Sequence, residues 1–138
     1  MDKKVRIGVV GCGGIANGKH MPNLAMIPEV EMVAFCDIIP ERAEKAAKKF
    51  GTPDAKTYTD YKELIKDETI DVVHVCTPNR SHSFISIDAM EAGKHVMCEK
   101  PMAKTYAEAK AMYEASVRTG KLLSIGYQNR QCGENLYA

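Results

Sequence analysis

Short apolar segments alternate with longer amphipathic segments along almost the whole chain. Six of the short segments are rich in β-branched, aromatic and other apolar residues, which is typical of strands buried on both faces of a sheet. The predicted strands are residues 5–10, 30–36, 57–58, 71–76, 95–98 and 122–126. Strands this short and this regularly spaced indicate one repeating strand–helix pattern.

The segments between these strands have the composition and the end signals of helices. The predicted helices are residues 14–27, 40–50, 60–66, 80–92 and 105–120. Pro22 is expected to divide the first of them, because proline has no N–H to donate. Asp60 with Glu63, and Thr105 with Glu108, have the spacing of capping boxes at helix starts. Helix ends are indicated by the glycines at positions 51, 93 and 120.

The alternation of strands and helices predicts the topology. A strand, a crossover helix and a second parallel strand form a right-handed unit, and repeating that unit builds an open sheet with helices on both faces. We therefore expect a doubly wound α/β domain with a parallel sheet. Residues 128–138 carry no pattern that predicts an element.

Composition and charge exclude several classes of protein. The 138 residues are 45% apolar with a net charge of +1, and there is no basic run, so no nucleic-acid partner is expected. No apolar stretch reaches the length of about 18 residues that a membrane span needs. The first residues run directly into a predicted strand, without the apolar segment of a secretory signal. We expect a cytoplasmic protein that has no membrane partner.

Cysteine spacing argues against a disulfide framework and against a zinc site. The five cysteines are an odd number and form no C-x-x-C pair, so we expect reduced thiols and no metal. Cys12, Cys36, Cys76 and Cys98 all fall at the carboxyl ends of predicted strands. They form either a thiol cluster near a ligand site or, more simply, small apolar residues that fill a buried sheet.

A glycine-rich motif lies between the first strand and the first helix. The sequence Gly11-Cys12-Gly13-Gly14-Ile15-Ala16 fits G-x-G-x-x-A. Gly11 can make the tight turn, Gly13 allows the backbone to approach a pyrophosphate, and the small Ala16 allows helix and strand to pack closely. Free N–H groups at the start of the helix favour phosphates. The motif predicts a dinucleotide site.

An acidic residue follows the second strand, where a dinucleotide site requires one. Asp37 comes 21 residues after Ala16, and its carboxylate can accept hydrogen bonds from the adenosine ribose while repelling a 2′-phosphate. NAD is therefore predicted in preference to NADP. Ile38 is assigned to the same site, and Arg42 could soften the preference if it turned inward. The plainer alternative is a glycine-rich turn beside an unrelated N-capping aspartate.

Two later motifs follow the fourth and fifth strands. They are Cys76-Thr77-Pro78-Asn79-Arg80-Ser81-His82 and Glu99-Lys100-Pro101. With the glycine motif and Asp37, they make the chain resemble the glucose-fructose oxidoreductase and inositol dehydrogenase family, Gfo/Idh/MocA, from Val5 to about Arg130. The resemblance implies an NAD-binding Rossmann domain.

The resemblance also implies roles for the residues of these motifs. The cofactor-contacting residues that it implies beside the nicotinamide half are Cys76, Thr77, Pro78, Asn79 and His82. Lys100 corresponds to the family's catalytic lysine, which contacts the reacting hydroxyl; without the resemblance it reads as a solvated surface lysine. Glu99 would tune Lys100 or contact ribose, and Gln128 could reach the nicotinamide ribose. In the family, the peptide bond before the residue that corresponds to Pro101 is often cis.

Members of this family continue into a second domain that covers the nicotinamide and usually forms the oligomer interface. We therefore expect residues 1–127 to be the cofactor domain and residues 128–138 to be a connection toward a substrate domain that this chain lacks. Hydride transfer needs a substrate held against the nicotinamide with water excluded. The chain alone is expected to bind NAD without measurable turnover.

Three functions remain open from the sequence. The first is the NAD domain of a dehydrogenase, homo-oligomeric as a whole protein, that acts on a sugar, a cyclitol or a related secondary alcohol. The second is a non-catalytic NAD-binding regulatory module, which needs no chemistry at Lys100. The third is an NAD-dependent glycosidase of the same family. Fold-level resemblance alone does not name a substrate.

Overall fold

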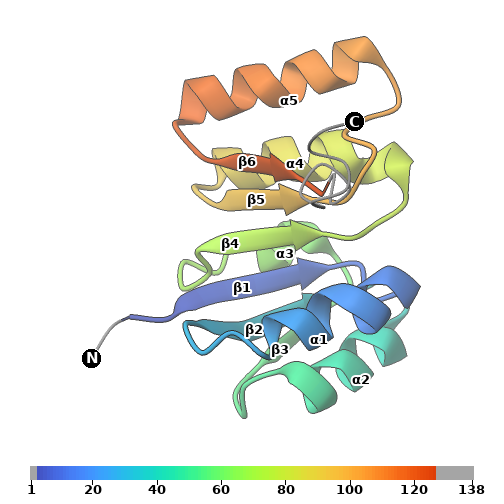
Figure 1. The fold of residues 1–138 in the computed structure, drawn as a ribbon, viewed down its shortest axis with the longest axis vertical. Helices are drawn as coiled ribbons and strands as arrows, with labels where there is room; N and C mark the ends of the chain where they lie inside the picture. Colours follow the sequence, from blue (N-terminus) through green and yellow to red (C-terminus); the bar gives the residue numbers. More distant parts are fainter. Residues whose placement is uncertain (1–2, 127–138) are drawn as a thin grey trace, which may run out of the picture.

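The computed structural model describes residues 3–126 and contains a six-stranded sheet in which every strand pair is parallel. The strand order is β3-β2-β1-β4-β5-β6, and the arrowheads point the same way (Figure 1). The strands are β1 (Val5–Val10), β2 (Val30–Cys36), β3 (Lys56–Tyr58), β4 (Val72–Val75), β5 (His95–Cys98) and β6 (Leu123–Ile125). This order confirms the doubly wound α/β prediction and places the reversal of strand order between β1 and β4.

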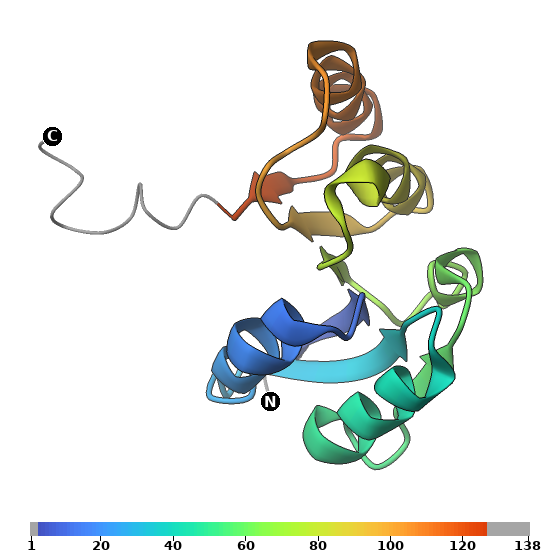
Figure 2. The same ribbon diagram turned by 90° about the vertical axis from the view of Figure 1, so that its right-hand side faces the viewer.

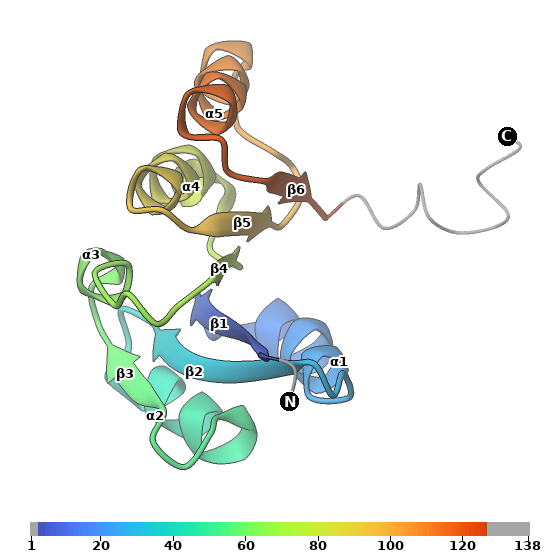
Figure 3. The same cartoon turned by 90° about the vertical axis from the view of Figure 1, so that its left-hand side faces the viewer.

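Helical segments cover both faces of the sheet. They are η1 (Ala16–His20), α1 (Met21–Leu24), α2 (Pro40–Phe50), α3 (Tyr61–Leu64), η2 (Asn79–Ser81), α4 (His82–Glu91) and α5 (Tyr106–Thr119). One core cluster joins η1, α1 and α2 to β1 and β2, and the other joins α3, α4 and α5 to the opposite face. Figure 3 shows α1 on one side of the sheet and α3, α4 and α5 on the other.

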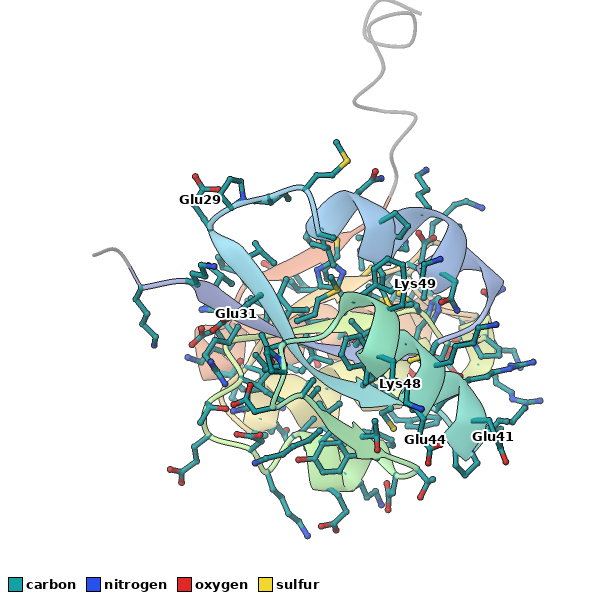
Figure 4. The ribbon with its side chains drawn as sticks, turned by 90° about the horizontal axis from the view of Figure 1, so that it is seen from below. Glu29, Glu31, Glu41, Glu44, Lys48 and Lys49 are labelled. Carbon is teal, nitrogen blue, oxygen red and sulfur yellow. The ribbon has the colours of Figure 1, made fainter. Side chains whose placement is uncertain are left out.

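Side-chain alternation along the strands explains why both faces of the sheet are apolar. On β1, Ile7 and Val9 enter the cluster under α1 and α2, whereas Val10 enters the cluster under α4. Helix α2 has the complementary pattern, because Ala43 and Ala46 are buried against the sheet. Its outer surface carries the charged, exposed residues Glu41, Glu44, Lys48 and Lys49 (Figure 4). This pattern is typical of a helix that covers a buried parallel sheet.

The first helix is divided next to Pro22, as predicted, but it ends earlier than predicted. Helical residues run without a break from 14 to 24, and the turn pattern changes at residue 21 from π-helical to α-helical. Pro22 lies in the first turn of α1, where its missing N–H costs least. The predicted end at residue 27 is wrong by three residues. The chain tightens into single turns there, because Pro28 disfavours a helical conformation at Ile27.

Two later helices, α3 and α5, begin at the predicted capping residues. The Asp60 side chain accepts the N–H of Lys62 at 2.9 Å, and Thr105 accepts the N–H of Glu108 at 3.1 Å. The α5 helix ends at a left-handed glycine, Gly120, as predicted. Two other bounds shift: α3 ends at Leu64 instead of residue 66, and a 3-10 turn over residues 79–81 precedes α4.

The sheet is covered on both faces over β1 and β2 but less completely over β5 and β6. Val96 and Leu123 point into the cluster under α4 and α5. Their neighbours Met97 and Ser124, which pair across the two strands, point the opposite way, and Ser124 is exposed. Among the helices of residues 3–126, none has the length and apolar character that a membrane crossing requires.

Candidate functional site

The predicted site residues gather at the carboxyl edge of the sheet, where a cavity of about 620 Å³ opens beside the strand-order reversal. Figure 2 looks onto this edge. The predicted residues that line the cavity are Gly11, Gly13, Asp37, Ile38, Arg42, Cys76, Thr77 and Pro78. They come from the ends of β1, β2 and β4. Motifs far apart in the sequence therefore meet at one place, as the parallel topology predicts.

The glycine loop has the geometry for which its glycines are required. Gly11 has φ +93°, and a Cβ there would lie 2.7 Å from the backbone carbonyl of Cys76. Gly13 and Gly14 instead face open space, with nothing within 4 Å of a Cβ built on either residue. Ala16 is fully buried against the sheet, as close helix packing requires. Gly11 thus serves the fold, and Gly13 leaves room for a ligand.

Asp37 holds the glycine loop as well as lining the cavity. One carboxylate oxygen accepts the N–H of Cys12 at 2.9 Å, and the other accepts the N–H of Ile39 at 2.9 Å. The residue is only 8% exposed, whereas Ile38 beside it is 85% exposed. Each carboxylate oxygen has a further lone pair, so Asp37 can still accept hydroxyl groups from the cavity.

Asn17 adds a contact that the motif does not name. Its side-chain amide donates to the carbonyl oxygens of Cys12 and Gly13, at 2.6 and 2.9 Å. The loop is therefore held both by the Asp37 carboxylate and by the Asn17 amide. A short polar residue one turn into the helix was the only sequence signal for it.

The four cysteines at the strand ends are buried and free. Burial raises the pKa of Cys12, Cys36 and Cys76 to about 12, and that of Cys98 to about 11. These thiols stay protonated at neutral pH and are poor nucleophiles and poor metal ligands. The structure therefore favours the simpler of the two interpretations, in which they fill the sheet. No group of three potential metal-binding side chains occurs among residues 3–126.

The loop after β4 places its histidine under the site instead of in the cavity. The His82 side chain is buried, and its ring nitrogens lie 2.7 Å from the Thr77 carbonyl oxygen and 2.8 Å from that of Pro101. The hydroxyl of Ser81 donates to Thr77 Oγ1 at 2.7 Å, which orders the same turn. Asn79 is exposed in that turn and does not line the cavity.

The loop after β5 carries the Glu99-Lys100-Pro101 motif. The Lys100–Pro101 peptide bond is cis, as the resemblance implied. Glu99 uses one oxygen to pair with His20 Nε2 at 2.5 Å and the other to accept the N–H of Lys100 at 3.0 Å. The Lys100 side chain is exposed and forms no hydrogen bond or ion pair with the described part of the chain. Sequence reasoning missed His20.

Several cavity residues were not predicted, because they follow β3 or belong to η2 and α4. Tyr61 and Phe84 line one wall with their ring centroids 6.1 Å apart, and Arg80 lines the same wall. The Tyr61 hydroxyl donates to Asp88 at 2.6 Å, and burial together with that bond raises the Tyr61 pKa. Aromatic residues at the start of a helix are too common to have identified this wall from the sequence.

A second hollow, of about 580 Å³, lies at the amino-terminal edge of the sheet. Its buried cation Lys94 donates to the carbonyl oxygen of Asp67 at 2.6 Å. That bond ties together two loops of the fold. Because ligands of open parallel sheets bind at the carboxyl edge, the cavity beside Asp37 is the candidate site.

Comparison with known proteins identifies the family of the chain. The family model GFO_IDH_MocA, described as an oxidoreductase family with an NAD-binding Rossmann fold, matches residues 5–127. Inositol 2-dehydrogenase of Salmonella typhimurium is 38% identical over 128 residues, which are 91% of this chain and 38% of that protein. The chain thus spans little more than a third of the length of that relative.

Two solved structures have the same fold with a bound cofactor. A dehydrogenase from Chromobacterium violaceum, in complex with NADH and UDP-GlcNAcA, has a TM-score of 0.90 and 32% identity; the match covers 99% of this chain and 39% of that one. A 3-ketoreductase from Actinomadura kijaniata, in complex with NADP and TDP-benzene, has a TM-score of 0.90 and 26% identity over 98% and 41% of the two chains. Gln128 lies outside the described residues.

Proposed function

The chain belongs to the Gfo/Idh/MocA oxidoreductase family, and from that premise we propose that it binds NAD(H) and serves hydride transfer to or from a secondary alcohol. The observation that carries this proposal is the placement of Asp37 and the glycine loop on one cavity at the strand-order reversal. A carboxylate at the end of β2 and an open glycine loop at the end of β1 are the two features that a dinucleotide site needs.

The cavity suits the adenosine half of the cofactor. Asp37 can accept the ribose hydroxyls, and the free space at Gly13 and Gly14 admits the pyrophosphate close to the backbone. Tyr61 and Phe84 offer an apolar wall to the adenine ring. The nicotinamide half then extends toward Thr77 and the loop after β5. When bound, the nicotinamide ring supplies the hydride donor or acceptor.

NAD is the proposed cofactor in preference to NADP. The Asp37 carboxylate is a fixed negative charge where the 2′-phosphate of NADP would lie, and burial limits its screening by water. Arg42 and Arg80 line the same cavity, and their positive charges favour the 2′-phosphate of NADP. Asp37 decides the preference because two backbone hydrogen bonds hold its carboxylate in place, whereas both arginine side chains are exposed to solvent, which screens their charge.

Lys100 is the proposed catalytic residue. Its ammonium is exposed at the carboxyl edge, one residue beyond a carboxylate held in place by His20. When a carbonyl is reduced, an ammonium there can donate a hydrogen bond to the carbonyl oxygen and give it a proton as the alcohol forms. When the alcohol is oxidised, the neutral amine accepts that proton as the carbonyl forms. Together with the dehydrogenases that resemble this chain, this arrangement supports a sugar or cyclitol substrate.

The cofactor-binding unit is proposed to be residues 1–127, with residues 128–138 as its connection; both bounds lie outside the described residues. The buried, protonated thiols suit a reducing compartment, which supports a cytoplasmic location. The expected homo-oligomer stays a prediction.

Calorimetric titration of the chain with NAD and with NADP tests the proposal. We expect micromolar or weaker binding of NAD and weaker binding of NADP. Thermal unfolding of the same sample shows whether the chain is folded. A folded chain that binds neither nucleotide would overturn the proposal.

A further inference from the structure

We propose that His20 and His82 are positioning residues that hold the Glu99–Lys100–Pro101 loop from opposite faces of the sheet and thereby fix the location of Lys100. The inference deepens the proposed function, because it rests on that function for the chemistry that Lys100 performs. The geometry of the two histidines does not depend on it.

His82 links the loops that follow β4 and β5. It begins α4, and only 1% of its surface is exposed. Its ring nitrogens lie 2.7 Å from the Thr77 carbonyl oxygen and 2.8 Å from the Pro101 carbonyl oxygen. A carbonyl oxygen only accepts, so the imidazole is the donor wherever one of these bonds forms. A neutral ring has one N–H and donates to one of these carbonyl oxygens at a time, whereas the imidazolium donates to both. In either form, the ring holds the Pro101 backbone, directly after Lys100, close to the Thr77 backbone.

His20 anchors the backbone before Lys100. It is the last residue of η1, and its Nε2 lies 2.5 Å from Glu99 Oε1. The second oxygen, Glu99 Oε2, accepts the N–H of Lys100 at 3.0 Å. Both side chains of the pair are largely buried, with 18% and 11% exposed. The Glu99 carboxylate thus connects His20, in the helical segment after the glycine loop, to the backbone N–H of Lys100.

The two anchors come from different layers of the fold. Segment η1 leads into α1 on one face of the sheet, and α4 packs on the other. Residues on either side of Lys100 are therefore restrained, while its ammonium stays exposed and unpaired within residues 3–126. This combination keeps the backbone in place and leaves the charged end for a ligand, as catalytic preorganisation requires.

Two further residues fit this arrangement. The His74 ring lies edge-on to the His20 ring, with centroids 6.1 Å apart, and confines it on the β4 side. Gly126 lies beside Glu99 just after β6, since a Cβ at this position would be in ordinary van der Waals contact with Glu99 Oε1, at 3.4 Å. The loop is therefore enclosed by β4, η1, α4 and the end of β6.

The first test measures the loop without any cofactor, so it is independent of the proposed function. Amide hydrogen exchange and ¹⁵N relaxation are recorded for the Lys100 N–H in the full chain, in His20→Ala and in His82→Ala. We expect protection of this amide to fall about tenfold or more in both variants. His20→Gln, whose amide can still donate to Glu99, should keep most of the protection.

His95 provides the matched control, because it lies at the opposite end of β5, where its Nδ1 accepts the N–H of Leu122. His95→Gln should leave the Lys100 amide unchanged. If His82→Ala does not fold, His82→Gln and Glu99→Gln take its place, since each weakens one anchor with little loss of volume. Unchanged protection at Lys100 in folded anchor variants, or no protection in the wild type, overturns the proposal.

The second test separates positioning from a merely structural role. ADP-ribose contains only the half of NADH that the Asp37 cavity would bind, so the affinities for both are measured for each variant. Loss of positioning should weaken NADH about fivefold or more and leave ADP-ribose unchanged. A parallel loss of both ligands would show a general structural defect and reject the positioning role. If the wild type binds neither ligand, the proposed function fails, and the exchange experiment still decides the role of the histidines.

Discussion

Asp37 and Lys100 lie at the same edge of the sheet, but the chain holds them in different ways. Asp37 is nearly buried, and two backbone N–H groups bind its two carboxylate oxygens. Lys100 is exposed, and its side chain has no partner among residues 3–126. The adenosine half of the proposed site is held by backbone, and the nicotinamide half is held by side chains of neighbouring loops.

This difference follows from what each half has to do. A binding site gains affinity when its groups are already oriented, because less freedom is lost when the ligand arrives. A group that exchanges a proton with the substrate must instead bring its own donor or acceptor atom within hydrogen-bond reach of the reacting atom. Each half can therefore be disturbed separately, and the following variants do so in order of decreasing effect.

The largest effect on stability is expected at Gly11, where the glycine loop after β1 meets the loop after β4. Gly11→Ala forces a Cβ into the Cys76 backbone at 2.7 Å and a side chain onto a residue with φ +93°. We expect the free energy of unfolding to fall by about 3 kcal/mol, measured by urea denaturation. Gly120→Ala is the control, because its φ is also positive but a Cβ there meets open space; it should lose only about 1 kcal/mol. Equal losses would show that the close approach to Cys76 contributes nothing.

Asp37→Ala tests the half that is held by backbone. It removes the proposed ribose acceptor and the carboxylate that binds the N–H of Cys12. We expect NAD affinity to fall about thirtyfold, or about 2 kcal/mol, in a calorimetric titration. Asp37→Asn keeps the shape without the charge and should narrow the difference between NAD and NADP. If NAD binds both variants as it binds the wild type, Asp37 is not a cofactor contact.

The pH dependence of stability tests the half that is held by side chains. Burial lowers the pKa of His74 from 6.5 to about 4, with a smaller contribution from His20. Between these values the unfolded chain binds a proton on His74 that the folded chain excludes, so stability falls as pH falls from about 6.5 to about 4. At pH 5 this loss is about 2 kcal/mol relative to pH 8.

His74→Gln removes that titration. We expect the difference in unfolding free energy between pH 8 and pH 5 to shrink by about 2 kcal/mol relative to the wild type. His95→Gln, at a partly exposed histidine, should leave the difference nearly unchanged. An identical pH profile for the wild type and His74→Gln would mean that His74 takes up its proton in the fold.

Gly13→Ala should have the smallest effect on the fold and a visible effect on binding. A Cβ at Gly13 has no neighbour within 4 Å, so the unfolding midpoint should stay close to that of the wild type. The methyl group would occupy space proposed for the pyrophosphate, and we expect NAD affinity to fall about tenfold. Unchanged affinity would move the pyrophosphate away from this glycine.

Local signals in the sequence were enough to predict the elements. The bounds of β5, His95–Cys98, match the prediction, as do the caps at Asp60 and Thr105, because strand composition and capping depend on residues close in sequence. The end of α1 was harder to place, since the helix tightens gradually into turns before Pro28. No local pattern in the sequence predicts the π-helical turn at residues 16–20.

The candidate site was predicted in part for the same reason. Glycine spacing and the position of Asp37 lie within one strand–helix–strand unit, so the sequence can indicate them. The pair of His20 with Glu99 joins residues 79 positions apart, and the contact of His82 with Pro101 joins two separate loops. No local pattern reports such contacts.

The sequence by itself determined a parallel α/β sheet and the location of a dinucleotide motif, because short-range periodicity and glycine placement are written residue by residue. Only the tertiary structure decided which side chains hold which loops in place. Folding brought the ends of β1, β2, β4 and β5 to one edge, buried His82 against the backbone of Thr77 and Pro101, and left Lys100 exposed. Hydrogen bonds between distant loops depend on that packing. They distinguish the residues that position the Lys100 loop from Lys100, the residue proposed to contact the substrate.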